Sequence, residues 1–146
     1  AASDVYKRQG DVLERATEKA LELLSTNENG FFIMIEGSQI DWGGHDNDET
    51  YVVEETLDFD RCIKIALDFA RENGETLVVV TSDHETGGMV VLDGNDATGE
   101  IRTTFTTGGH TASLIPVLAY GPGADLFTGI YENTGFFERF LEAFDF

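Results

Sequence analysis

The chain has 146 residues, enough for one domain with a hydrophobic core, and its 41% hydrophobic and 11% aromatic content is ordinary for a globular protein. Nine basic and 28 acidic residues give a net charge of -19, which repels nucleic acids and anionic membranes, so binding to either is not expected. The same charge attracts cations, although a solvated acidic surface that only aids solubility has the same composition.

The N-terminal stretch, residues 1–10, has no hydrophobic periodicity and no apolar signal-peptide core. We expect it to be a foreign or artefactual leader, with residues 11–146 forming the domain. No apolar run reaches the roughly 18 to 20 residues of a membrane helix. Cys62 is the single cysteine, so an internal disulfide is impossible, and we expect it to pack in the core.

From Asp11 onward, apolar residues recur at helical spacing, and Gly30 ends this first predicted helix. The residues expected to face inward are Val12, Ala16, Ala20, Leu23 and Leu24. The apolar run 31–35 then predicts a strand buried on both faces, followed by a Gly-rich loop that reaches His45. Ligands bind at the carboxyl ends of strands in α/β sheets, so Glu36, Asp41 and His45 are candidate site residues.

A long helix is predicted over 51–71, with Asn73-Gly74 as its left-handed cap. Its inward residues are expected to be Leu57, Ile63, Leu67 and Ala70. The next buried strand, 76–81, again turns polar at its carboxyl end, where Asp83 and His84 follow.

The last third of the chain predicts further short elements. Segments 89–92 and 101–105 flank an Asp-Gly pair, which favours an antiparallel hairpin, and a Gly-rich link then presents His110. A strand over 115–120 and an amphipathic helix over 133–144 complete the pattern, the helix having an aromatic face expected to pack in the core. Helices alternating with buried strands indicate an α/β fold.

The three histidines all lie in polar or Gly-rich turns after predicted strands. With Asp41 and Asp83 they supply the mixed nitrogen and oxygen ligands that zinc uses, and the oxygen donor Glu36 suits magnesium. Paired metals can stabilise the attacking and leaving oxygens at a tetrahedral anion. That chemistry fits phosphate monoesters, sulfate esters and phosphodiesters alike, so the donor set by itself does not select the substrate.

Three runs, GFFIMIEGSQIDWGGH, VVTSDHETGG and TGGHT, occur in the same order as in the C-terminal half of alkaline phosphatases, which this chain resembles. The resemblance implies an α/β fold, part of a mixed, mostly parallel sheet flanked by helices, with the N-terminal half missing. His110 follows His84 by only 26 positions, too few for the large insertion that mammalian members of the family have there. In this respect the chain resembles the compact bacterial members.

The resemblance also implies a role for each matched residue. Asp41, His45 and His110 match the first zinc site, Asp83 and His84 match part of the second, and Glu36 matches a magnesium ligand, so the implied cofactors are two Zn²⁺ and one Mg²⁺. The implied ligands are phosphate monoester substrates and inorganic phosphate, handled through a phosphoserine intermediate. A homodimeric parent protein, periplasmic or secreted, is implied as well.

Other parts of the family pattern are not found in this chain. The missing half is expected to hold the nucleophilic serine, the aspartate shared by the second zinc and magnesium, a Thr or Ser magnesium ligand and the phosphate-binding arginine. No catalytic residue is therefore assigned, and the chain alone is expected to be inactive. Ser38 and Ser82 are expected to be turn hydroxyls, and Trp42 is a substrate-adjacent or simply a packing residue. The open alternatives are a related sulfatase, phosphodiesterase or phosphomutase fragment and a noncatalytic module that binds divalent cations.

Overall fold

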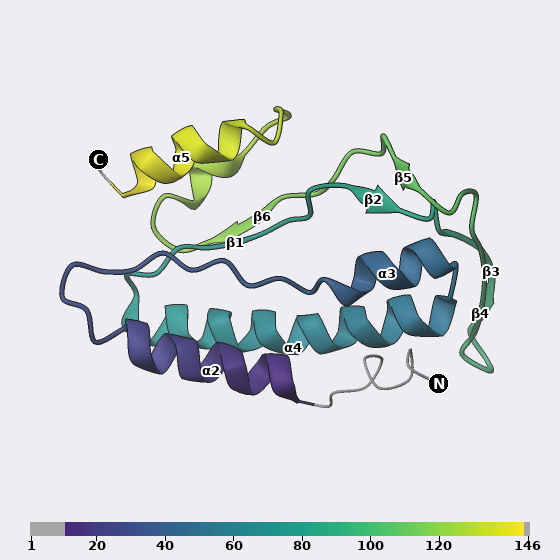
Figure 1. Cartoon of the computed structure of the whole chain (residues 1–146), viewed down its shortest axis with the longest axis horizontal. Helices are drawn as coiled ribbons and strands as arrows, with labels where there is room; N and C mark the ends of the chain where they lie inside the picture. The colour runs from purple at the N-terminus through teal and green to yellow at the C-terminus, as the bar shows by residue number, and fades with distance from the viewer. Residues whose placement is uncertain (1–10, 145–146) are drawn as a thin grey trace.

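The computed structural model describes residues 11–144, and its longest elements are two helices that pack along each other (Figure 1). Helix α2 spans Val12–Leu24 and helix α4 spans Glu49–Asn73, close to the predicted ranges. The predicted left-handed cap of α4 is confirmed, because Gly74 has φ 69° and its N–H donates to Ala70 O. The Asp48 carboxylate caps the other end by accepting from Tyr51 N at 3.0 Å.

The predicted inward faces of these helices are partly wrong. In α2 the buried side chains are Thr17 and Leu21, whereas Val12 and Leu23 are 49% and 59% exposed. In α4, Leu57 is 54% exposed. When a helix has apolar residues on more than one side, its sequence does not determine which side is buried. Here the contact between α2 and α4 determines it. Cys62, at 2% exposed, is in the core as expected.

Helix α3, Gln39–Asp46, lies where the sequence predicts a loop. Its two glycines, Gly43 and Gly44, disfavour a helix locally, but both are buried against neighbouring segments, and this packing compensates for their low helix propensity. The helix ends at Asn47, which has φ 52° and donates its backbone N–H to Gly43 O and Gly44 O.

The segment 31–37 is extended but forms no strand ladder with the described residues, contrary to the prediction of a buried strand. Its side chains alternate in exposure, and Phe32 and Met34 are 58% and 82% exposed. Phe31 contacts Phe69 of α4, while Phe32 contacts Phe140 on the opposite side, with ring centroids 6.2 Å and 5.2 Å apart. A strand ladder requires a neighbouring strand, which the local sequence cannot supply, so the apolar run alone is not enough to make this segment a strand.

The strands form three antiparallel pairs. The strand β1, Val78–Val80, pairs with β6, Leu118–Tyr120; β2, Glu85–Thr86, pairs with β5, His110–Thr111; and β3, Val90–Asn95, pairs with β4, Glu100–Thr104. The predicted hairpin over 89–105 is confirmed by β3 and β4, but its turn lies at 96–99, whereas the Asp93-Gly94 pair expected to form the turn lies within β3. Within residues 11–144 every ladder is antiparallel, so the parallel pairing expected of the sheet is not among them.

The C-terminal part packs through aromatic side chains. The 3-10 helix η1, Ala124–Phe127, precedes helix α5, Gly135–Ala143. Phe127 is 3% exposed and lies 5.2 Å from Phe140 between ring centroids, so the aromatic face of α5 is a packing surface, as predicted. Phe137 is the exception, at 63% exposed.

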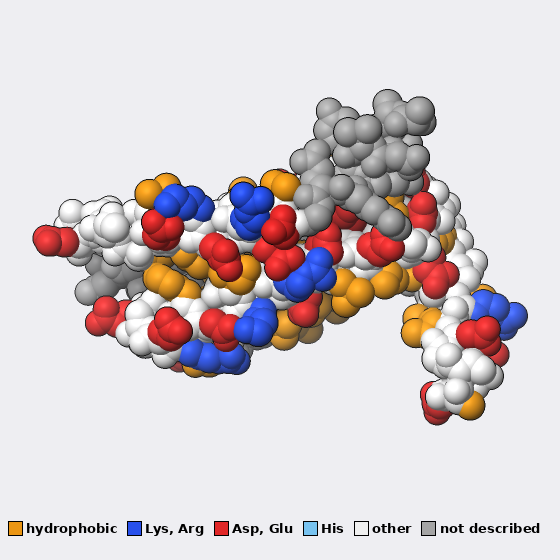
Figure 2. All heavy atoms as spheres, turned by 90° about the horizontal axis from the view of Figure 1, so that it is seen from below, with side chains coloured by type: hydrophobic (Ala, Val, Ile, Leu, Met, Phe, Trp, Pro, Cys, Tyr) orange, Lys and Arg blue, Asp and Glu red, His pale blue; other side chains and the backbone are white. Residues whose placement is uncertain are grey.

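The elements form an α/β arrangement in which the extended segments lie between α4 on one side and α5 on the other, while the β3–β4 hairpin projects at one end (Figure 1). Figure 2 shows acidic side chains intermingled with basic ones over the helical face. Among residues 11–144, no helix is long and apolar enough to cross a membrane.

Candidate metal centre

Asp41 and His45 lie one turn apart on α3, and this helix packs directly on β2 (Figure 1). A Cβ atom added at Gly44 would lie 2.7 Å from the carbonyl oxygen of Thr86, which is too close for any residue other than glycine. The helical spacing brings the His45 Nε2 atom to 3.5 Å from Asp41 Oδ1. The close contact therefore places these two donors beside the strand that follows His84.

The loop before His110 is held on the end of α3 by hydrogen bonds. His45 Nδ1 lies 2.7 Å from the carbonyl oxygen of Gly108, and the Asn47 side-chain amide donates to Thr107 O at 2.8 Å. The ladder between β2 and β5 sets His110 opposite Thr86. Because a carbonyl oxygen only accepts, His45 Nδ1 carries the proton and its Nε2 lone pair is free to bind a cation.

Three donor atoms from distant parts of the sequence converge here. Asp41 Oδ1 lies 3.5 Å from His45 Nε2 and 3.6 Å from His110 Nε2, and the two Nε2 atoms are 3.2 Å apart. Tetrahedral zinc with bonds of 2.0 to 2.1 Å separates its donors by about 3.3 to 3.4 Å. The three separations fit one tetrahedral ion to within a few tenths of an ångström.

His84 joins the same cluster. Its ring stacks on that of His110 with centroids 3.5 Å apart and an interplanar angle of 19°. Donor atoms of Asp41, His84 and His110 lie within 4.8 Å of one another, so residues that the family resemblance divides between two zinc sites are neighbours. Asp83 is more peripheral, with its carboxylate 78% exposed and Oδ2 at 3.3 Å from His84 Nε2.

Two other predicted site residues are not joined to this cluster. Glu36 is exposed at the end of the extended segment and makes no hydrogen bond or ion pair within residues 11–144. Trp42, on α3 next to Asp41, is 63% exposed, so it is not a packing residue within the described structure.

The two serines near the motifs differ, because only Ser82 acts as the expected turn hydroxyl. Ser82 Oγ donates to the carbonyl oxygen of His84 at 2.7 Å, as expected of a turn hydroxyl. Ser38 precedes α3 but its side chain makes no capping hydrogen bond.

Thr86 is a site residue that the sequence analysis missed. Its hydroxyl donates to Asp41 Oδ1 at 2.5 Å and lies 3.1 Å from His84 Nδ1. The available signal was its position two residues after His84 at the start of a Gly-Gly turn, where a hydroxyl is also a common turn former.

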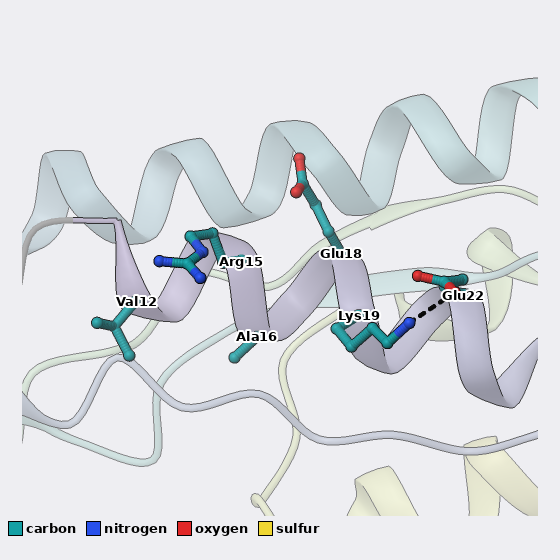
Figure 3. A pocket seen from close by; sticks show the side chains of 6 residues that line it. All are labelled: Val12, Arg15, Ala16, Glu18, Lys19 and Glu22. Carbon is teal, nitrogen blue, oxygen red and sulfur yellow. Dashed lines mark hydrogen bonds and ion pairs between the residues drawn. The ribbon is translucent and has the colours of Figure 1, made fainter.

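One surface hollow of the described structure lies away from this cluster. It has a volume of about 540 Å³ and is lined by residues of α2 alone, among them Lys19 and Glu22, which form an ion pair at 2.6 Å (Figure 3). An open depression on one helix provides no converging donors, so the histidine cluster remains the candidate site.

Comparison with known proteins supports a single family. A sequence model of that family, alkaline phosphatase, matches residues 6–104. Alkaline phosphatase 3 of Bacillus subtilis is 30% identical over 192 aligned residues, covering 84% of this chain and 42% of that protein. The alkaline phosphatase of Escherichia coli is 36% identical over 141 residues, covering 86% of this chain and 30% of that protein.

Solved structures agree. The alkaline phosphatase of the Antarctic bacterium TAB5 superposes with a TM-score of 0.88 and 50% identity, covering 94% of this chain and 42% of that one. A histidine-substituted variant of the TAB5 protein, solved with Mg bound in its M3 site, gives a TM-score of 0.87 and 48% identity, with the same coverage. The chain therefore spans less than half the length of these relatives.

Proposed function

This chain belongs to the alkaline phosphatase family, and on that premise we propose that it is the part of a phosphate monoester hydrolase that carries most of the metal ligands. The observation that supports this best is the triangle of Asp41, His45 and His110 donor atoms, with sides of 3.2 to 3.6 Å. Family membership also favours phosphate monoesters over the sulfate esters and phosphodiesters that the donor set left open.

In this proposal Asp41, His45 and His110 hold the first zinc, and Asp83 and His84 contribute to the second. Zinc bound here would supply Lewis acidity and lower the pKa of a bound water to about 7. The hydrogen bond from His45 Nδ1 to Gly108 O fixes the orientation of the ring and favours the tautomer whose Nε2 lone pair faces the first site. The large excess of acidic residues favours retention of divalent cations.

We assign Glu36 to magnesium and Trp42 to the substrate side of the site. The Glu36 carboxylate is exposed and has no competing partner among residues 11–144, so it is available to a hard cation that prefers oxygen donors. The Trp42 ring is 63% exposed beside Asp41, where it would lie next to a bound phosphate ester.

The remaining catalytic groups are proposed to come from outside the matched stretch. Ser82 is engaged with a backbone carbonyl, and the Ser38 side chain makes no hydrogen bond to a base within residues 11–144, so neither is assigned as nucleophile. For the complete protein, family membership is the support for a phosphoserine intermediate, a homodimer and a periplasmic or secreted location.

Zinc titration by calorimetry tests the metal assignment. We expect the chain to bind zinc with an affinity that persists at high salt, because direct coordination is not screened as diffuse charge attraction is. His45→Ala should weaken binding by more than about 100-fold, beyond the 10- to 100-fold typical of outer-sphere changes. Asp96→Ala, which removes an exposed acid from the hairpin turn, is the matched control and should leave the affinity unchanged. Equal losses in both variants would indicate diffuse binding and contradict the proposal.

Turnover of p-nitrophenyl phosphate with zinc and magnesium tests the catalytic part. The 146-residue chain should be no faster than the free metals, whereas the full-length protein should show saturable turnover that His45→Ala abolishes. Saturable activity of the chain itself, lost in His45→Ala, would show that its catalytic groups are complete. A full-length protein that binds zinc but hydrolyses no ester would indicate a noncatalytic cation-binding module.

A further inference from the structure

We propose that Thr86 is a positioning residue whose hydroxyl joins a ligand of the first metal site to a ligand of the second. Its Oγ1 atom is 2.5 Å from Asp41 Oδ1 and 3.1 Å from His84 Nδ1. The role in metal binding rests on the function proposed above, whereas the hydrogen-bond geometry does not depend on it.

The number of protons determines the direction of both bonds. A threonine hydroxyl has one proton, and an ionised carboxylate only accepts, so that proton is donated to Asp41. The hydroxyl oxygen is then an acceptor for His84, which must carry its proton on Nδ1. When the ring is neutral, this leaves the lone pair on Nε2, which lies 3.3 Å from Asp83 Oδ2.

The backbone holds the hydroxyl in place. Thr86 lies in the ladder between β2 and β5, opposite His110, and its carbonyl oxygen lies under Gly44 of α3. Movement of the Thr86 backbone toward α3 is blocked by this contact, and movement away would break the ladder. The ladder with β5 and the contact with Gly44 together hold the Thr86 backbone in the position from which its hydroxyl reaches Asp41.

One hydroxyl consequently orients two ligands. Asp41 belongs to the set with His45 and His110, and His84 belongs to the set with Asp83. All three side chains are partly buried, and a hydrogen bond away from bulk water is electrostatically stronger than one in water. Without the hydroxyl, we therefore expect His84 to be no longer held in one tautomer and Asp41 to be no longer held in one rotamer.

The tautomer is tested by NMR of the chain in dilute solution, labelled with ¹⁵N in its three histidines and free of metal. We expect His84 to be protonated on Nδ1 in the unmodified chain and in Thr86→Ser, which keeps the hydroxyl. Thr86→Val, which keeps the shape, should shift His84 toward the Nε2-protonated form. A His84 ring protonated on Nε2 alone in the unmodified chain would overturn the proposal without any variant.

Zinc affinity, measured by competition with a chelator, is the second readout. Thr86→Val should bind zinc about 10- to 100-fold more weakly, and Thr86→Ser should restore binding to within about 3-fold. Thr103→Val is the matched control, because it removes a similar bond, from Thr103 Oγ1 to Glu49 Oε2 at 2.6 Å, away from the histidines. Equal affinities for the two valine variants would overturn the role of Thr86 in metal binding. Absence of zinc binding by the unmodified chain would instead contradict the proposed function and leave the tautomer result standing.

Discussion

Two buried glycines determine how closely helix α3 approaches its neighbours, Gly44 toward β2 and Gly43 toward α4. At Gly44 a Cβ atom would meet Thr86 O at 2.7 Å, and at Gly43 it would meet Val52 N at 2.9 Å. Both obstacles are backbone atoms, which cannot rotate away as a side chain can. At the residue scale, the site therefore depends on the absence of two side chains as much as on the presence of its donors.

Gly44→Ala sets two opposing effects against each other. Alanine gains about 1 kcal/mol in helix propensity, but overpacking against a fixed backbone oxygen costs roughly 1 to 3 kcal/mol or more. We expect a net loss of stability of about 1 kcal/mol, seen as a lower urea midpoint, together with weaker zinc binding because α3 moves off β2. Gly94→Ala is the control, since its Cβ would be 3.6 Å from Glu100 O, an ordinary contact. A variant at Gly44 more stable than the unmodified chain would contradict the steric argument.

At the scale of elements, the contact between α2 and α4 forms much of the core. Thr17 and Cys62 are 1% and 2% exposed, and Thr17 satisfies its hydroxyl by donating to Leu13 O at 2.8 Å. Arg61 links the outer edge of the same helix pair by donating to Glu14 Oε1 at 2.6 Å. Burial raises the pKa of the Cys62 thiol, and a hydrogen bond with Thr17 offsets part of that rise.

The raised pKa of Cys62 predicts a pH dependence of stability. The folded chain keeps the thiol proton to a higher pH than the unfolded chain, so stability falls as pH rises above the ordinary thiol pKa of about 8.5. Urea unfolding between about pH 8 and pH 10 should show a steeper decline for the unmodified chain than for Cys62→Ala. The alanine variant loses stability at every pH through lost packing, but it lacks the thiol contribution to the slope. Equal slopes would show that the thiol does not titrate differently on unfolding.

At the scale of the whole molecule, the total accessible surface is large for the mass of the chain, and many large apolar side chains are exposed. The chain exposes 10287 Å², whereas a compact monomer of 16.0 kDa exposes roughly 7400 Å². Met34, Leu114 and Ile130 are 82%, 79% and 87% exposed, and the segment 31–37 forms no ladder with the described residues. More than half of each relative's length lies outside the match, which is enough protein to cover such a surface.

We therefore expect the isolated chain to self-associate as its concentration rises, because unpaired strand edges and large apolar patches pair with other copies. Light scattering after size exclusion measures this directly. The double variant Met34→Lys and Leu118→Lys should associate less at little cost in stability, since both side chains are largely exposed. A chain that remains monomeric at every concentration would contradict the expectation.

The sequence by itself determined the features that depend on local order: helices α2 and α4 with the Gly74 cap, the β3–β4 hairpin, and the family, through motifs that contain its acids and histidines. These follow from hydrophobic period, turn residues and residue identity, which need no distant partner. Tertiary structure alone decided that 39–46 is a helix, that Phe32 and Met34 stay exposed, and that Thr86 bridges Asp41 and His84. Each depends on contacts between segments far apart in the chain, where packing and hydrogen bonding outweigh local propensity.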